Sequence, residues 1–242
     1  MTAPLSPSDF FDLSQEPRAD IFDGVLYAWE ALPRLNAYLQ RLVGGKGHQV
    51  FGTVAADAFL APGDDIFIGP GAVVEPGAFI AGPAYIGPDA HVRHGAYIRS
   101  NALIGAGALV GHATEIKNSI LLSGAFAPHF NYVGDSILGR GVNLGAGVKL
   151  SNLTVVSVRD PATGRRPTLQ IRIENELFDT GLTKLGAILG DGVQIGCNSV
   201  LNPGALIGPR SLVYANASLP KGYYPPDIII KLRQTFEYAE RL

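Results

Sequence analysis

Branched apolar residues recur every six positions through the middle of the chain. The series runs through Ile68, Val74, Ile80, Ile86, Val92, Ile98, Ile104, Val110 and Ile116. Two positions before most of them lies a small residue: Ala72, Ala78, Ala84, Ala90, Ala96, Ala102, Ala108 or Thr114. A helix would repeat every 3.6 residues and a half-buried strand every two. A fixed six-residue period is typical of the parallel β-helix.

Side-chain packing explains this period. Each repeat is expected to form one flat side of a coil, and three repeats complete one turn. The branched residue points inward, and so does the small residue two positions earlier, because side chains alternate along a strand. Glycine and proline are expected at the corners, where the chain needs positive φ or a fixed bend. A glycine-rich loop or a β-sandwich would predict neither the strict phase nor the alanine column.

The period divides the chain into three segments. We expect an N-terminal helical cap at 1–50, a β-helix at 51–224 and a C-terminal helix at 225–242. Within the cap, short helical segments separated by Pro33 are expected to cover one open end of the coil, because exposed sheet edges need covering. Pro225 and Pro226 stop the repeat before the C-terminal helix.

Two interruptions break the repeat. After Ile116 the next clean series starts at Leu138, which predicts a bulge of about four residues within 117–137, of the kind that carries binding loops. The period is lost again over 153–183. There, alternating residues at 154–158 and 169–173 flank a Pro/Gly turn, which predicts a hairpin arm that projects from the coil.

Composition limits the classes of partner. A formal net charge of −2 gives no reason to expect nucleic acid. The single cysteine, Cys197, excludes an internal disulfide framework and fits a reducing compartment. The sequence contains no run of eighteen apolar residues, so no membrane span is expected. The first residues do not look like a secretion signal. A cytoplasmic protein is therefore expected.

Four of the five histidines are interpreted as surface residues: His48, His91, His94 and His112. Their spacing does not suit a zinc site of the kind that some β-helix trimers have, so no metal is expected. His129 differs because it lies in the first interruption, among polar residues. Histidine titrates near neutral pH as a residue type, which suits general-base chemistry on an amine.

Several segments in order make the chain recognisable. Residues 68–231 resemble the acetyltransferase half of the bifunctional N-acetylglucosamine-1-phosphate uridyltransferase/glucosamine-1-phosphate acetyltransferase. The closest resemblance is to archaeal-type sugar-1-phosphate nucleotidylyltransferases with a C-terminal β-helix. The segments are Val92–Ala96, Glu115–Asn118, His129–Asp135, Asn143–Gly147 and Lys184–Asp191.

The resemblance implies a left-handed β-helix, a homotrimer with active sites between subunits, and acetyl-CoA as co-substrate. It implies a hexosamine 1-phosphate as acceptor, either glucosamine or galactosamine 1-phosphate. By position, His129 matches the catalytic base, and Arg93 and Lys117 match the groups that hold the sugar phosphate. The remaining matches are Tyr132, Asn143 and Lys184 on the acceptor, Asn152 near the reacting groups, and Ala146, Cys197, Ala215 and Lys231 along the coenzyme.

The expected function is therefore an amino-sugar-phosphate N-acetyltransferase of nucleotide-sugar biosynthesis. Residues 1–50 are too few for a nucleotide-binding domain and hold no glycine-rich phosphate loop, so uridyl transfer is not expected. The arm at 153–183 leaves the amino sugar open. The alternative is a non-catalytic β-helix subunit or paralogue of a sugar nucleotidyltransferase, which binds sugar nucleotide or a partner protein.

Overall fold

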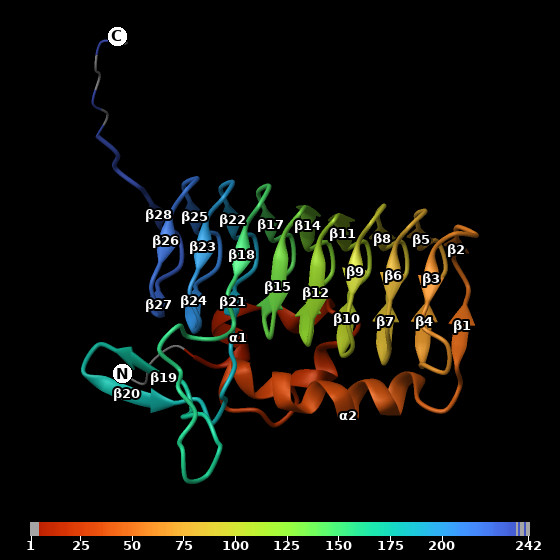
Figure 1. Ribbon diagram of the computed structural model, residues 1–242, viewed down its shortest axis with the longest axis horizontal. Coiled ribbons are helices and arrows are strands. Elements are labelled where there is room, and N and C mark those ends of the chain that lie inside the picture. Colours follow the sequence, from red (N-terminus) through yellow and green to blue (C-terminus); the bar gives the residue numbers. More distant parts are fainter. Residues whose placement is uncertain (1–4, 236, 238–239, 241–242) are drawn as a thin grey trace.

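Short strands at six-residue spacing form a three-sided parallel coil (Figure 1). The computed structural model describes residues 5–235, 237 and 240. Sheet A contains β1 (His48–Val50), β4 (Ile66–Ile68), β7 (Ala84–Ile86), β10 (Ala102–Ile104), β13 (Ser119–Leu121), β16 (Ile137–Leu138), β21 (Ala187–Leu189), β24 (Ala205–Ile207) and β27 (Gly222–Tyr224).

The other two sides have the same parallel pairing. Sheet B contains β2 (Thr53–Val54), β5 (Val73–Val74), β8 (His91–Val92), β11 (Leu109–His112), β14 (Phe126–His129), β17 (Asn143–Leu144), β22 (Gln194–Ile195), β25 (Leu212–Val213) and β28 (Ile229–Ile230). Sheet C contains β3 (Phe59–Leu60), β6 (Phe79–Ile80), β9 (Tyr97–Ile98), β12 (Glu115–Lys117), β15 (Tyr132–Gly134), β18 (Lys149–Leu150), β23 (Val200–Leu201) and β26 (Ser218–Leu219).

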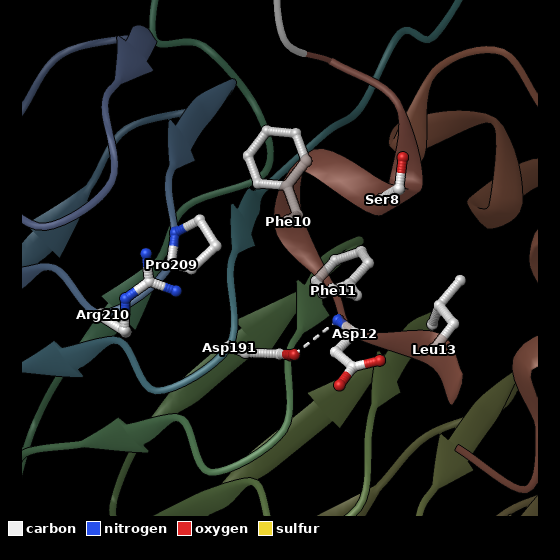
Figure 2. A pocket seen from close by; sticks show the side chains of 8 residues that line it. All are labelled: Ser8, Phe10, Phe11, Asp12, Leu13, Asp191, Pro209 and Arg210. Atoms are coloured by element: carbon white, nitrogen blue, oxygen red, sulfur yellow. Dashed lines mark hydrogen bonds between the residues drawn. The ribbon is translucent and has the colours of Figure 1, made fainter. Parts of the chain in front are cut away.

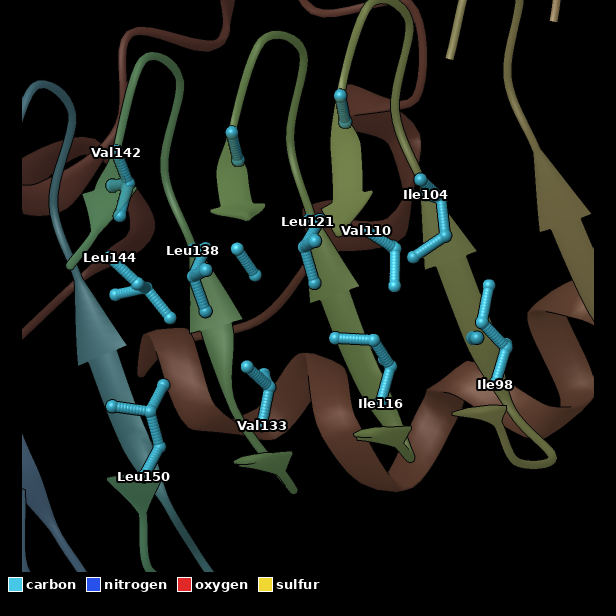
Figure 3. Close-up of a cluster of buried hydrophobic side chains, with 14 of the residues drawn as sticks. Ile98, Ile104, Val110, Ile116, Leu121, Val133, Leu138, Val142, Leu144 and Leu150 are labelled. Carbon is cyan, nitrogen blue, oxygen red and sulfur yellow. The ribbon is translucent and has the colours of Figure 1, made fainter. Parts of the chain in front are cut away.

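The coil interior confirms the predicted columns. Branched residues from the three sheets fill it, with the small residues beside them, and both sets are buried. Figure 3 shows ten of these side chains pointing into the same space, from Ile98 to Leu150. The predicted hexapeptide-repeat β-helix is therefore confirmed as the fold of the chain.

The predicted bulge within 117–137 is wrong. Ile104 pairs with Leu121 and Ile116 with Val133, so these coils are 17 residues long where the earlier ones have 18. The coil loses one residue at a corner and gains no loop. Asn118 and Asp135 close the two shortened corners with φ of 48° each, a left-handed conformation that asparagine and aspartate tolerate.

The N-terminal segment covers a side of the coil, which corrects the prediction that it covers an end. Its elements are α1 (Pro7–Phe10), η1 (Leu13–Gln15), η2 (Ala19–Phe22), η3 (Ala28–Glu30) and α2 (Ala31–Val43). Helix α2 runs along sheet A, across β7, β10 and β13 (Figure 1). Pro33 does not divide it, because a proline in the first turn lacks only an N–H that has no intrahelical partner there.

Sheet A needs this cover because its outer face is apolar. Tyr85, Leu103 and Ile120 point outward from the middle of their strands and are buried in a cluster with Trp29 and Leu39. Strands that are buried on both faces read as continuous apolar runs. Sheets B and C have no such cover among the described residues.

The arm at 153–183 contains a hairpin, but its strands are not the predicted pair. The antiparallel strands are β19 (Gln170–Ile173) and β20 (Glu176–Asp179), which pack against the later strands of sheet A through Leu169 and Ile171. Residues 154–158 form no strand, because their valines are exposed and pair with nothing among the described residues.

The predicted C-terminal helix is also wrong over the described residues. β27 and β28 form one more coil, in which Tyr224 pairs with Ile207 and Ile230 with Val213. The six-residue spacing thus continues past Pro225 and Pro226, and residues 231–235 contain no helix. Phe236, part of the predicted helix face, lies outside the described residues. No helix in the described part of the chain has the length and apolar character that a membrane span requires.

Candidate active site

The turns between sheets B and C stack into a ladder along the coil. At each step, a backbone N–H donates to the carbonyl of the coil before it: Ala113 to His94 at 3.3 Å, Phe130 to His112 at 2.7 Å, Gly147 to His129 at 3.0 Å, Asn198 to Ala146 and Asn216 to Cys197 at 2.8 Å each. We call this ladder the histidine corner, and its residues are His94, His112, His129, Ala146, Cys197 and Ala215.

The histidine corner aligns His129 with three of the four predicted coenzyme residues. His129 is exposed at the end of β14, and Ala146, Cys197 and Ala215 follow it in successive coils. Lys231 lies beyond them, with its Nζ 5.9 Å from the centre of the Tyr214 ring. Small side chains therefore separate an imidazole from an ammonium group along the coil.

Asn131 fixes the backbone that carries His129. Its side chain accepts a hydrogen bond from the His129 N–H at 3.1 Å and donates to the Gly145 carbonyl at 2.8 Å. It is 3% exposed and occupies an inward position where most repeats have alanine. No role was predicted for Asn131 from the sequence, although an amide in the alanine column was a visible signal.

A second polar group surrounds Asp135, at the turn between sheets C and A. The Asp135 carboxylate is 4% exposed and accepts hydrogen bonds from Lys117 at 2.9 and 3.0 Å and from Asn118 at 2.7 Å. Asn152 also donates to it. We call these four residues the aspartate corner. The Lys117 charge, which was predicted for the sugar phosphate, is offset by Asp135 in this chain.

Tyr132 lies on sheet C between the two corners. Burial raises the pKa of the Tyr132 phenol, and the nearby carboxylates of Glu115 and Asp135 raise it further. A Cβ on Gly134 would lie 2.6 Å from the Tyr132 hydroxyl and 2.8 Å from Asn152 Nδ2, so the phenol points toward the aspartate corner. A neutral hydroxyl in this position can donate a hydrogen bond to a sugar or phosphate oxygen.

The other predicted acceptor residues are distributed around the coil. Lys184 is exposed beside Leu185, whose N–H donates to the Asn152 carbonyl at 3.1 Å. Arg93 is near the histidine corner, directly before His94. Asn143 lies on sheet B, in register with Phe126 and Gln194. One chain therefore brings His129 together with the coenzyme residues, but it divides the acceptor residues between the corners and sheet B.

A cavity of about 460 Å3 lies where the N-terminal segment meets the coil, at the turn between sheets A and B. Figure 2 shows Phe10, Phe11 and Asp12 facing Asp191 and Pro209 across it. The Asp191 carboxylate accepts the N–H groups of Asp12 and Arg140 at 2.7 Å each, so it fastens the N-terminal segment. This cavity lies at a different turn from both polar corners.

Asp191 should make stability depend on pH. Burial raises the pKa of its carboxyl above 3.8 in the folded protein. Its contribution to the free energy of unfolding is therefore complete below pH 3.8 and is lost as the pH rises through the raised pKa. We expect Asp191→Asn to remove this decline, which urea denaturation of both proteins at pH values from 3.5 to 7 would measure. An equal decline in the variant would contradict the assignment.

No group of three His, Cys, Asp or Glu side chains with metal-binding geometry occurs among the residues that the structure describes. His94 and His112 have parallel rings, 5.5 Å between centres and 6° between planes. The His94 ring donates from Nδ1 to the Pro76 carbonyl at 2.7 Å, and the His112 ring donates from Nδ1 to the His94 carbonyl at 2.9 Å. Their spacing of 18 and 17 residues to the next histidine could have revealed this column.

The fold and its two corners define a hexapeptide-repeat β-helix protein with a polar site on its wall. A family model described as the GMPPB C-terminal domain matches residues 80–160. A protein from Methanococcus maripaludis named bifunctional protein GlmU is 30% identical over 211 residues, which are 85% of this chain and 46% of that protein.

A bifunctional sugar-1-phosphate nucleotidylyltransferase/acetyltransferase from Sulfurisphaera tokodaii is 31% identical over 105 residues, which are 43% of this chain and 24% of that protein. The resemblance inferred from the sequence is thereby confirmed, and the chain spans less than half of each of these two relatives. Among solved structures, the acetyltransferase domain of PglB from Neisseria gonorrhoeae has 14% identity and a TM-score of 0.29, over 76% of this chain and 60% of that one.

Proposed function

We propose that the chain is an acetyl-CoA-dependent N-acetyltransferase that acts on a hexosamine 1-phosphate, with His129 as general base. The observation that carries this proposal is the alignment of an exposed imidazole with Ala146, Cys197 and Ala215 along one corner, with Lys231 beside Tyr214 in the next coil. The relative named bifunctional sugar-1-phosphate nucleotidylyltransferase/acetyltransferase supports acetyl transfer and a sugar-phosphate acceptor.

The chemistry requires one proton acceptor and no covalent enzyme intermediate. The 2-amine of the sugar attacks the thioester carbonyl carbon, a C–N bond forms, and the C–S bond breaks. His129 takes the proton that the amine loses, and the coenzyme leaves as a thiolate that is then protonated. A backbone N–H of the coil wall is the available donor for the developing oxyanion.

Basic residues are proposed to bind the phosphates of both substrates. In this proposal, Lys231 binds the phosphates of the coenzyme and Arg93 binds the phosphate of the acceptor. Within one coil, strand β15 of sheet C separates His129 from Asp135, so the histidine corner and the aspartate corner lie at opposite edges of sheet C. The proposal therefore includes a homotrimer, in which a neighbouring copy places its aspartate corner, with Tyr132 and Lys184, opposite the histidine corner.

An assay of thiol release tests the proposed function. The protein is incubated with acetyl-CoA and either glucosamine 1-phosphate or galactosamine 1-phosphate, and free coenzyme thiol is measured against time. We expect acceptor-dependent release with at least one of the two sugars, and no release with glucose 1-phosphate, which lacks the amine. Absence of release with both amino sugars would contradict the proposal and favour a non-catalytic β-helix subunit.

A further inference from the structure

The three histidines of the histidine corner occupy equivalent positions but are held differently. His94 and His112 each donate from ring Nδ1 to the carbonyl one coil before them. The rings consequently lie back over that coil: a Cβ on Gly77 would be 3.2 Å from His94 Cε1, and one on Gly95 would be 3.8 Å from His112 Nδ1. Such a tether turns an imidazole away from the next coil.

His129 lacks this tether. β11 and β14 place it in register with His112, so the His112 carbonyl is the acceptor that its ring would use. That carbonyl instead accepts the Phe130 N–H at 2.7 Å. In the coil before, the corresponding bond from Ala113 to the His94 carbonyl is 3.3 Å long, and that carbonyl also accepts the His112 ring. Neither ring nitrogen of His129 has a hydrogen bond to any described residue.

The residue after each histidine follows the same trend. Gly95, Ala113 and Phe130 are all left-handed, with φ of 68°, 50° and 38°. The carbonyl of the coil before accepts no N–H from Gly95, a long hydrogen bond from Ala113 and a short one from Phe130. The φ angle does not set this order by itself, because Gly147, with φ of 72°, makes a hydrogen bond of 3.0 Å. Each backbone bond gained thus leaves less of the carbonyl for the ring.

Phe130 is an unusual residue for this position. The equivalent left-handed residues of the later coils are Gly147, Asn198 and Asn216, types that tolerate positive φ. A bulky residue in this region is an outlier, and such outliers cluster at functional sites. The Phe130 ring lies 6.4 Å from the His129 ring, and a Cβ on Gly147 would lie 3.4 Å from its Cε2. The aromatic side chain therefore reaches over the next coil, beside Ala146.

We propose that Phe130 is a positioning residue that keeps the His129 imidazole free of the corner. Its backbone N–H occupies the carbonyl that would otherwise tether the ring, and the untethered ring can turn toward Ala146 in the next coil. The release of the ring stands on the geometry alone. Its effect on acetyl transfer rests on the proposed function.

The tautomer of each histidine tests the release. In the intact protein, 15N NMR of the imidazoles should find the hydrogen on Nδ1 in His94 and His112, and predominantly on Nε2 in His129. Phe130→Gly should shift His129 to the Nδ1–H tautomer, because glycine allows the geometry of Gly95. Phe130→Leu is the matched control that keeps a bulky side chain and should leave the His129 tautomer unchanged.

Kinetics complete the test. Phe130→Gly should lower the turnover number for acetyl transfer roughly tenfold, because the general base then points away from the amine. The turnover number of Phe130→Leu should stay within about twofold of that of the unchanged protein. A His129 ring already in the Nδ1–H form, or a Phe130→Gly variant with unchanged tautomer, would overturn the proposal. If the tautomers behave as expected but no variant transfers acetyl groups, the release of the ring stands and the proposed function fails.

Discussion

His129→Ala should lose about two to four orders of magnitude in turnover for acetyl transfer, since general-base catalysis contributes roughly 10²–10⁴-fold. The Michaelis constants for acetyl-CoA and the amino sugar should change much less, because the imidazole acts mainly in the transition state. The melting temperature should be unchanged, because the side chain is exposed and its ring has no described hydrogen bond. Initial rates of thiol release and a thermal melt measure both effects.

His48→Ala is the matched control for this variant. His48 is also exposed, and its ring contacts the Ala61 carbonyl at 3.0 Å, in the first coil and away from the histidine corner. Its activity should equal that of the unchanged protein. A His129→Ala protein that retained more than about a tenth of the turnover would contradict the general-base role.

Asp135→Ala should lower the free energy of unfolding by about 3 kcal/mol, because removing one partner of a buried ion pair leaves the other charge uncompensated. The substitution removes the acceptor of Lys117, Asn118 and Asn152 at once. The Lys117 side chain is 24% exposed, so water relieves part of the cost, and the estimate lies at the lower end for such pairs. Urea denaturation measures the loss.

A double-mutant cycle separates the ion pair from simple loss of packing. Lys117→Met removes the charge, and in that background Asp135→Ala should cost at least about 1 kcal/mol less, since residues in one network are not additive. Equal costs in both backgrounds would show that the carboxylate does not stabilise the fold through Lys117. A total loss below about 1 kcal/mol would contradict the buried pair itself.

The six-residue period predicted the coil because it reports directly on which side chains point inward. It did not predict the shortened coils, because Leu121 comes one residue early and Ala127 replaces a branched residue. The shortened coils differ from the others in the length of one corner. Because a corner contributes no inward side chain, the column of apolar residues does not show that length. The cover over sheet A was readable in principle, since Tyr85, Leu103 and Ile120 recur at coil spacing as outward apolar residues.

The candidate site was predictable where it follows the period. His129, Ala146, Cys197 and Ala215 share one phase of the coil, so the fold aligns them once the resemblance has selected them. The pairing of Lys117 with Asp135 was not predicted, because it depends on how two side chains meet across a corner. The tethering of the histidine rings depends on whether a ring nitrogen or a turn N–H takes the carbonyl of the coil before, which a sequence pattern does not show.

The most direct measurement is a titration of the protein with acetyl-CoA, followed through backbone amide chemical shifts. We expect the amides of Phe130, Gly147, Asn198 and Asn216 to shift together, because they line the histidine corner. The amides around Asp191, at the cavity beneath the N-terminal segment, should stay unchanged. Shifts centred on Asp191, or no shift at the histidine corner at saturating coenzyme, would contradict the account.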